Sequence, residues 1–467
     1  PSWSWSSSLP PNLSPSLNPS PSLSPRAKPK PKPKAKRKPK PGPGPDPDPD
    51  PPPLVSIIVP AHNAAATLDE CLESVLAQTY DLGRIEVSVF DDNSRDETPS
   101  LLESWRQRFA RAGVAAFIVG SHATIEASMR RRKCYDYERR GDEDYALNEA
   151  QSSFPSTPES PCGCGWAKNR AIAQSSGDVL CFLDADDVML PRRVERQVAA
   201  LAEAWSCSVI GCGFVRTPAD ATAHYTRWAN STTQEQLWLE QFRECTILMP
   251  TWVMRRGTYD AVGPFDEVDP AEGEAEDLKW FQRYLAVLGR RRPRRCVARV
   301  GGEGDPLLIY RFSSNSGSWR SSRRFLLEIR VKAFERRILD EEENPAHAER
   351  WRRFAIWGSG RDGKNFYSQL RPEYRHRVAC MIDINPKKVG TVYVNGKLEP
   401  VRKIPIVHFR DVDPEEKLGV VVCVARRSPA DRKGAAERAS KQGDFDDLEA
   451  NVASLGLVEG ESVWFFV

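Results

Sequence analysis

The feature that most constrains this chain is a repeated pairing of a short apolar run with a helical pattern. "LVSIIVP" at 54–60 is rich in β-branched residues, and apolar residues recur at helical spacing over 67–80. "IEVSVFDDNS" at 85–94 and "DVLCFLDADD" at 178–187 are further strand-type runs, and each precedes a helical pattern. This alternation predicts a parallel sheet covered by helices.

The 467 residues are enough for two or three domains. Pro, Ser, Lys and Asp dominate the first 53 residues, which therefore cannot bury a core and are predicted to be disordered. The predicted organisation is a tail at 1–53, an α/β domain at 54–320 with a flexible insertion at 121–162, a helical connector at 321–350, and a smaller Rossmann-like domain at 351–467.

Cysteine usage and hydropathy bear on location. The 11 cysteines include no paired C-x-x-C motif of a zinc site, and we expect reduced thiols, which favour a cytoplasmic setting. No apolar run approaches the ~20 residues of a membrane span. Because the sequence begins at Pro1, organelle targeting stays open.

Polar side chains follow three of the predicted strands, at Pro60–Asn63, Asp91–Ser94 and Asp184–Asp187. Ligands of open parallel sheets sit beyond the carboxyl ends of the strands, so we expect these loops to share one rim. Clustered carboxylates raise one another's pKa unless a cation offsets them, and Mg²⁺ or Mn²⁺ prefers oxygen ligands together with substrate phosphates. The pattern predicts a metal–diphosphate site, with helix caps and turns as the alternative reading.

Six blocks in order, from "VSIIVPAHNAAATLDECLESVLAQTY" through "FLDADDVMLP" to "GPFDE" and "EDLKWFQR", resemble family 2 glycosyltransferases of the GT-A fold. The resemblance covers about residues 54–315 and implies a Rossmann-like mixed sheet, a UDP-sugar donor and inverting transfer. It implies that Asp186 binds the metal, and that the general base is Asp277 of the Glu276-Asp277 pair. The implied donor contacts are Pro60, Ala61, His62, Asn63, Asp91, Asp92 (uracil), Lys168, Asp184 (ribose) and Ala185.

Two points in these blocks stay open. The acids at 276–277 also suit the first turn of a helix, where carboxylates complement the helix dipole; Asp277 is favoured as the base because it directly precedes the apolar Leu278. Members of the family often carry a His after a "YR" strand, where this chain has Ser313. Arg311 is the alternative phosphate contact.

A finer resemblance is to the animal group named after β-1,3-N-acetylglucosaminyltransferases and better described as queuosine-tRNA galactosyltransferases. It implies transfer of galactose from UDP-galactose to queuosine in tRNA. Basic clusters at 130–133, 290–295 and 320–324 suit RNA phosphates, and Trp228 and Trp252 are candidate acceptor contacts. The alternatives are a glycan or lipid acceptor with UDP-N-acetylglucosamine or UDP-glucose, and a catalytically weak RNA- or nucleotide-binding protein.

The C-terminal domain contains "GSGRDG" at 358–363, a G-x-G-x-x-G turn between a predicted strand and a predicted helix. Asp383 follows Gly363 at the distance that suits the acid of a dinucleotide site. The candidate residues are Gly358, Gly360, Gly363 and Asp383. Glycosyl transfer needs no hydride carrier, so a structural or acceptor-binding use is favoured over NAD.

Overall fold

The computed structural model describes residues 51–125, 160–206, 208–267, 275–312, 321–342, 345–425 and 448–467. The predicted disordered tail, apart from its last three residues, lies outside this range. So does most of the predicted insertion, as do Ser313 and the basic cluster at 130–133. None of the helices in the described ranges is long and apolar enough to cross a bilayer.

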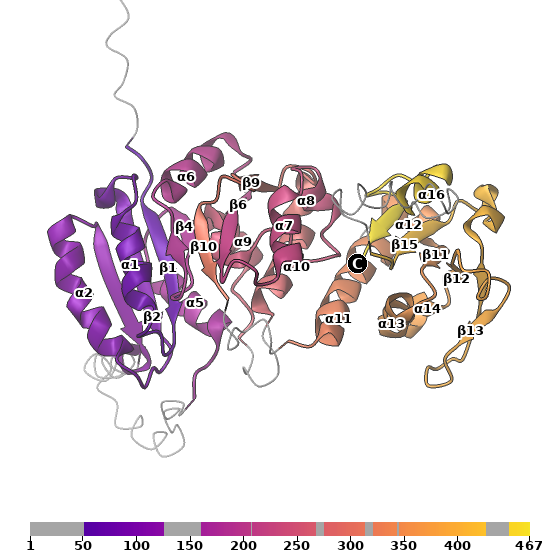
Figure 1. Cartoon of the computed structure of the whole chain (residues 1–467), viewed down its shortest axis with the longest axis horizontal. Helices are drawn as coiled ribbons and strands as arrows, with labels where there is room; N and C mark the ends of the chain where they lie inside the picture. The colour runs from indigo at the N-terminus through magenta and orange to yellow at the C-terminus, as the bar shows by residue number, and fades with distance from the viewer. Residues whose placement is uncertain are drawn as a thin grey trace, which may run out of the picture. The chain divides into compact units, whose positions relative to one another are not determined.

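Seven strands of the described chain form the sheet of the N-terminal domain, in the order β3-β2-β1-β4-β8-β6-β9 (Figure 1). The first four are parallel, whereas β8 runs antiparallel to both β4 and β6. The sheet is therefore mixed, as the family resemblance implied. Its strands are β1 (Val55–Ala61), β2 (Ile85–Asp91), β3 (Ala116–Ser121), β4 (Val179–Phe182), β6 (Val209–Cys212), β8 (Val253–Arg255) and β9 (Val297–Val300).

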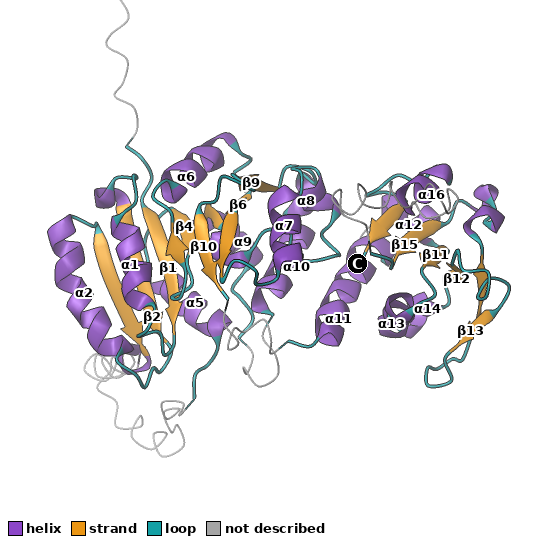
Figure 2. Cartoon of the chain, viewed as in Figure 1, coloured by secondary structure: helices purple, strands orange, loops and turns teal. Residues whose placement is uncertain are grey.

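Helices cover both faces of this sheet, because both faces of its central strands are apolar. Ile57 of β1 packs into a core with α1, α2 and α6, whereas its neighbour Ile58 packs into a second core with α5, α9 and α10. Figure 2 shows the helices around the strands. The helices are α1 (Leu68–Leu76), α2 (Thr98–Ala112), α5 (Cys164–Gln174), α6 (Arg193–Glu203), α7 (Ala223–Ser231), α8 (Gln236–Leu239), α9 (Arg256–Val262) and α10 (Glu276–Val287).

The run at 208–216 reads as one strand in the sequence but forms two, in different sheets. β6 ends at Cys212, and β7 (Phe214–Thr217) joins a small sheet with β5 (Val188–Met189) and β10 (Leu308–Arg311). Gly213 lies between them, where a Cβ would be 2.5 Å from the Gly302 nitrogen. The small sheet places Arg311 next to the loop that follows β4, because β10 pairs with β5.

The C-terminal domain has its own sheet, in the order β13-β14-β12-β11-β15-β16 among the strands described, with only β13 antiparallel. This confirms the second α/β sheet. Its strands are β11 (Phe354–Trp357), β12 (Val378–Ile382), β13 (Val392–Val394), β14 (Lys403–Val407), β15 (Gly419–Val422) and β16 (Val463–Phe465). Its helices, with those before it, are α11 (Arg323–Phe334), α12 (Pro345–Trp351), α13 (Arg361–Gln369), α14 (Pro372–Arg375) and α16 (Leu448–Ser454).

Aromatic side chains join the end of the chain to α8 and to the segment that follows it. The Trp464 ring of β16 lies 5.2 Å from the Trp238 ring, and Phe466 stacks on Phe242 with ring centroids 5.5 Å apart. Phe242 is fully buried in the same core as the C-terminal strands. The core of the C-terminal domain thus includes a residue from the N-terminal 250 residues.

Candidate active site

The carboxyl ends of β1, β2 and β4 form one rim of the large sheet. Ala61 at the end of β1 pairs with Asp91 at the end of β2, and Ile58 pairs with Phe182 at the end of β4. The three loops predicted to share a rim therefore do so. The rim carries the two acid groups, at 91–92 and at 184–187.

The loops after β1 and β2 are locked together by hydrogen bonds. His62 Nδ1 lies 2.7 Å from the Asp92 carbonyl oxygen, and the Asn63 amide donates to Ser94 Oγ at 2.8 Å. Asn63 has φ = 49°, in the left-handed region that Asn tolerates better than most residues. Pro60 and Ala61 belong to the end of β1 itself. This loop is therefore held in one conformation beside Asp92.

Asp92 is buried and its carboxylate already has partners. Its Oδ1 accepts the Cys162 amide at 3.0 Å and its Oδ2 accepts the Gly163 amide at 2.9 Å. His122 Nε2 lies 2.8 Å from Oδ1, and the His122 ring stacks on Trp166 at 4.5 Å. The uracil contact predicted for Asp92 would require one of these bonds to yield. The neighbouring Asp91 instead accepts the Ser94 amide at 3.1 Å.

His122 is a residue of this site that the sequence analysis missed. His122 follows β3, the strand next to β2. Its position directly after a strand was the signal that the sequence offered. Ligand atoms of Asp92, His122 and Cys162 all lie within 4.8 Å of one another, a set that also suits a transition metal. The hydrogen bonds between Asp92 and the other two residues account for this grouping without an ion.

Asp184, Asp186 and Asp187 form the second acid group, with carboxylate oxygens within 4.8 Å of one another. Among the described residues, Asp184 Oδ1 and Asp187 Oδ2 are buried without a hydrogen-bond partner. Burial raises the pKa of all three; for Asp186, burial and the Asp184 charge raise the pKa to about 6. Ala185 joins this loop to α1, since its carbonyl accepts the Thr67 hydroxyl at 3.1 Å.

Asp187 lies in this cluster rather than only beginning the following turn. It is fully buried, and its Oδ1 accepts the Arg311 amide at 2.9 Å. The Arg311 guanidinium contacts Glu70 of α1, a mostly exposed carboxylate. Three carboxylates with two orphaned oxygens fit a hard divalent cation, which would supply the missing partners.

Lys168 and Glu276 form a buried ion pair between α5 and the start of α10, with Nζ and Oε1 2.7 Å apart. Although burial opposes ionisation, the Lys168 ammonium and its hydrogen bond hold the pKa of Glu276 below its usual value. Lys168 is therefore occupied by Glu276 rather than free for a donor. The pair also acts on the acid cluster, since the Lys168 charge lowers the pKa of Asp184 and the Glu276 charge raises it.

Asp277 behaves differently from its neighbour. Burial and the adjacent Glu276 charge raise the pKa of Asp277 to about 7, and its Oδ1 accepts the Leu278 amide at 2.6 Å. Both acids lie in the first turn of α10, so the dipole interpretation also fits their position. One carboxyl is held ionised by a lysine and the other titrates near neutral pH.

The two tryptophans predicted to contact an acceptor lie elsewhere. Trp252 is fully buried beside Trp280 and donates to the Ile247 carbonyl, so it cannot contact an acceptor in this structure; this prediction is wrong. Trp228 is part-buried and donates to Glu240 at 2.6 Å. It lines a cavity that also involves α11 and α13.

In the C-terminal domain the glycine-rich turn follows β11 as predicted. Gly358 has φ = 113°, and a Cβ on Gly363 would lie 1.8 Å from the Gly358 carbonyl oxygen. Gly360 has open space beside it. Asp383 is taken by its own chain: it accepts the Ser359 hydroxyl, and Lys388 Nζ lies 3.0 Å from its Oδ2.

Residues 56–117 and 157–263 match the model of the Glycosyl transferase family 2. An uncharacterized glycosyltransferase of Rickettsia typhi is 26% identical over 223 residues, which are 46% of this chain and 54% of that protein. The Escherichia coli UDP-Glc:alpha-D-GlcNAc-diphosphoundecaprenol beta-1,3-glucosyltransferase WfgD is 30% identical over 148 residues, 32% of this chain and 41% of that protein. The chain thus spans about half the length of such relatives.

Among solved structures, Staphylococcus aureus TarS 1-349 in complex with UDP-GlcNAc aligns with a TM-score of 0.42 and 16% identity, covering 63% of this chain and 70% of that one. A mannosyltransferase of Pyrobaculum calidifontis in complex with GDP-Man and Mn²⁺ aligns with a TM-score of 0.39 and 18% identity, covering 62% and 65%.

Proposed function

We propose, on the premise that this chain is a family 2 glycosyltransferase, that it transfers a sugar from a nucleotide-sugar donor to an acceptor hydroxyl, with inversion. The observation that carries the proposal is the buried group of Asp184, Asp186 and Asp187, within the matched domain, whose orphaned oxygens suit a divalent cation. Mg²⁺ or Mn²⁺ bound there would neutralise the donor diphosphate as it leaves.

The proton of the acceptor hydroxyl goes to Asp277 in this proposal. A general base works best when its pKa lies near the working pH, and the pKa of Asp277 is raised to about 7. Glu276 is the weaker candidate because Lys168 holds it as a charged partner. Lys168 then has a positioning role, keeping the start of α10 against α5.

For the donor and acceptor, a relative whose name states its substrates favours a UDP-hexose and a glycan or lipid-linked sugar. WfgD uses UDP-glucose and an acceptor on diphosphoundecaprenol, and it shares 30% identity with part of this chain. We therefore place this alternative ahead of queuosine in tRNA. The tRNA acceptor stays a competing proposal, supported by exposed arginines that include Arg323 and Arg324.

The first test measures donor hydrolysis and transfer with UDP-glucose, UDP-N-acetylglucosamine, UDP-galactose and GDP-mannose. Activity should require Mn²⁺ or Mg²⁺. It should fall at least ~100-fold in Asp186→Asn, because the charge of the leaving diphosphate is no longer stabilised by the metal. The matched control is Asp260→Asn, an exposed acid on α9. Full activity of Asp186→Asn, or activity in EDTA, would refute the metal assignment.

The second test separates the acceptors with the active donor in hand. A diphosphate-linked sugar lipid and a queuosine-bearing tRNA are incubated in parallel, and each is analysed for a hexose mass increase. We expect the increase on the lipid-linked acceptor. An increase on the tRNA nucleoside alone would reverse the ranking.

A further inference from the structure

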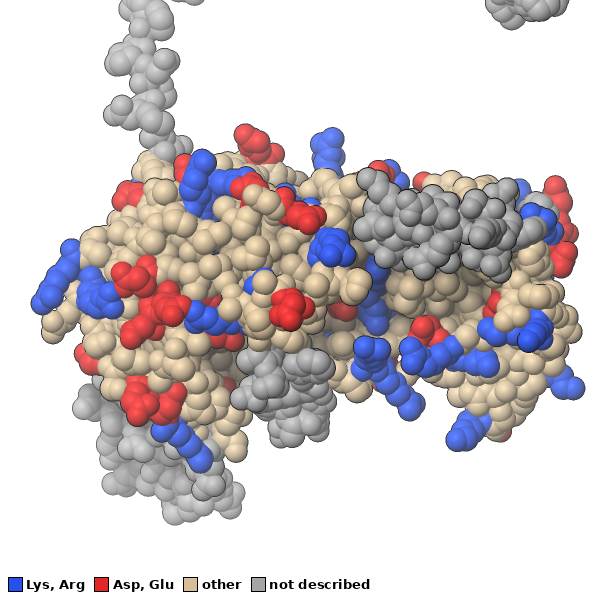
Figure 3. All heavy atoms as spheres, viewed as in Figure 1, with Lys and Arg blue, Asp and Glu red and all other residues tan. Residues whose placement is uncertain are grey.

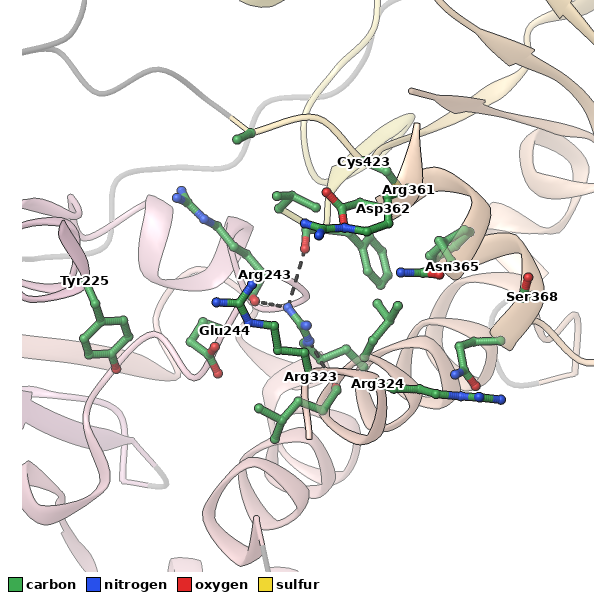
Figure 4. Close-up of a pocket in the computed structure, with 18 of the residues that line it drawn as sticks. Tyr225, Arg243, Glu244, Arg323, Arg324, Arg361, Asp362, Asn365, Ser368 and Cys423 are labelled. Atoms are coloured by element: carbon green, nitrogen blue, oxygen red, sulfur yellow. Dashed lines mark hydrogen bonds and ion pairs between the residues drawn. The ribbon is translucent and has the colours of Figure 1, made fainter. Parts of the chain in front are cut away.

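A cavity of about 1020 Å³ lies between α11 and α13, and Asp184, Asp186 and Asp187 are not among its lining residues. Its lining includes Arg323, Arg324 and Arg330 of α11, Arg361 and Asp362 of α13, and residues that follow β15. Figure 4 shows Arg361 and Asp362 across the cavity from Arg323 and Arg324. Trp228, Arg323 and Arg324 of this lining also belong to the competing tRNA-acceptor proposal. The volume of the cavity is close to that of sites for drug-sized ligands.

The lining is strongly cationic. Six lining side chains are Arg or Lys, whereas Glu244 and Asp362 are the only carboxylate side chains among its described residues. Two of the six cations are paired, Arg243 with Glu240 and Arg361 with Asp362. Within the described ranges Arg323 and Arg324 form no ion pair, and both are exposed. In Figure 3 the Lys and Arg atoms gather over α11 and α13 around a hollow in the surface. Such a lining attracts an anion, and guanidinium groups bind phosphate through paired hydrogen bonds.

Arg330 extends this charge into the wall of the cavity. Its guanidinium donates to the Arg243 carbonyl and, at 3.5 Å, to the carbonyls of Phe242 and Phe466. Burial lowers the pKa of Arg330, and the charge of Glu244, another lining residue, opposes that shift. The backbone carbonyls therefore hold the guanidinium in place beside one acid of the cavity.

The cavity also lies where a doubly wound sheet binds ligands. β11 is flanked by β12 on one side and β15 on the other, so the direction of strand order reverses beside it. Arg361 follows β11 and Cys423 follows β15, and both line the cavity. Ligands of open α/β sheets bind in the crevice outside the carboxyl ends of the strands at such a reversal.

We propose that this cavity is a second ligand site, which binds a small nucleotide-type ligand through its phosphate group. The turn at 358–363 brings the backbone of β11 and α13 close together, and Gly360 leaves open space beside it. Arg323 and Arg324 are the phosphate contacts, because Arg361 is paired with Asp362, with Nε and Oδ1 3.4 Å apart. Recognition of a ribose by Asp383 is not part of this site, because Asp383 is bound to Ser359 and Lys388.

The test measures binding of radiolabelled AMP and of inorganic pyrophosphate by equilibrium dialysis, in EDTA so that a metal-dependent donor site stays empty. We expect AMP to bind and pyrophosphate to compete with it. The double variant Arg323→Glu/Arg324→Glu should weaken AMP binding at least about tenfold, since two charge-assisted contacts become repulsive. The control is Arg106→Glu/Arg111→Glu on α2, which should bind as the unmodified protein does.

Binding should persist in Asp186→Asn, so failure of the glycosyltransferase proposal and failure of this one are distinguishable. Hydrogen exchange gives a second readout, with AMP slowing exchange in α13. Absence of binding by AMP at millimolar concentration, or equal binding by the Arg323→Glu/Arg324→Glu variant, would overturn the proposal. Capture of a short RNA strand without AMP binding would also overturn it, in favour of a nucleic-acid surface.

Discussion

The raised pKa of Asp277 makes a quantitative prediction about the pH dependence of transfer. With a pKa of about 7, Asp277 is ionised in only about one tenth of molecules at pH 6 and in about nine tenths at pH 8. If Asp277 is the base, kcat/KM should rise about tenfold across this range, with a single acidic limb. Steady-state rates at saturating Mn²⁺, measured in steps between pH 5.5 and 9, give the profile.

Two variants decide whether that limb belongs to Asp277. Asp277→Asn should lower kcat by ~10²–10⁴, the usual contribution of a general base, and abolish the limb. Glu276→Gln should move the limb to lower pH, because the Glu276 charge helps raise the pKa of Asp277 and the freed Lys168 ammonium lowers it. An unchanged limb in Asp277→Asn would refute the reasoning.

Removing Glu276 alone leaves a buried ammonium without its partner, which typically costs about 3–5 kcal/mol of folding free energy. The paired variant Lys168→Met/Glu276→Gln removes both charges and should regain most of that stability. Thermal denaturation of each variant is measured before the kinetics. It distinguishes a variant that is folded but inactive from one that is unfolded.

Further predictions concern stability. Burial raises the pKa of the three carboxyl groups of the 184–187 cluster, so the folded protein binds protons more tightly than the unfolded chain does. The metal-free protein should therefore lose stability as the pH rises from about 4, through the Asp186 pKa of about 6. Mn²⁺ should restore the stability at pH 8 but not at pH 5. Asp187→Asn should raise the metal-free melting temperature while weakening Mn²⁺ binding; a lower melting temperature in EDTA would contradict this. Gly363→Ala should destabilise the C-terminal domain by several kcal/mol, because its Cβ would meet the Gly358 carbonyl, whereas Gly360→Ala should be nearly neutral in the same denaturation assay.

The sequence predicted the sheet and its rim because strand ends carry a local signal, a β-branched run followed by polar residues. It could not predict that 208–216 breaks into two strands, since the close approach of Gly302 to Gly213 depends on residues about 90 positions away. The same limit applied to Trp252. The sequence does not distinguish an aromatic residue in a core from one on a binding surface.

Partners of the site residues were harder still to predict. Lys168 was expected near the donor, yet its ammonium pairs with Glu276, more than 100 residues later in the chain. His122 carries no motif, and only its place after β3 brings it to Asp92. Asp187 resembles an ordinary turn residue until the small sheet places the Arg311 amide against it.

The aromatic contacts of Trp464 and Phe466 with Trp238 and Phe242 bear on cooperativity. These rings belong to one core that joins Phe242 to the C-terminal strands, so the C-terminal domain does not retain its full core without the segment that contains Phe242. Residues 52–467 should therefore unfold in one calorimetric transition, with equal van't Hoff and calorimetric enthalpies. A protein shortened to remove β16 would expose Phe242, and the N-terminal α/β domain alone would be a poor choice for expression.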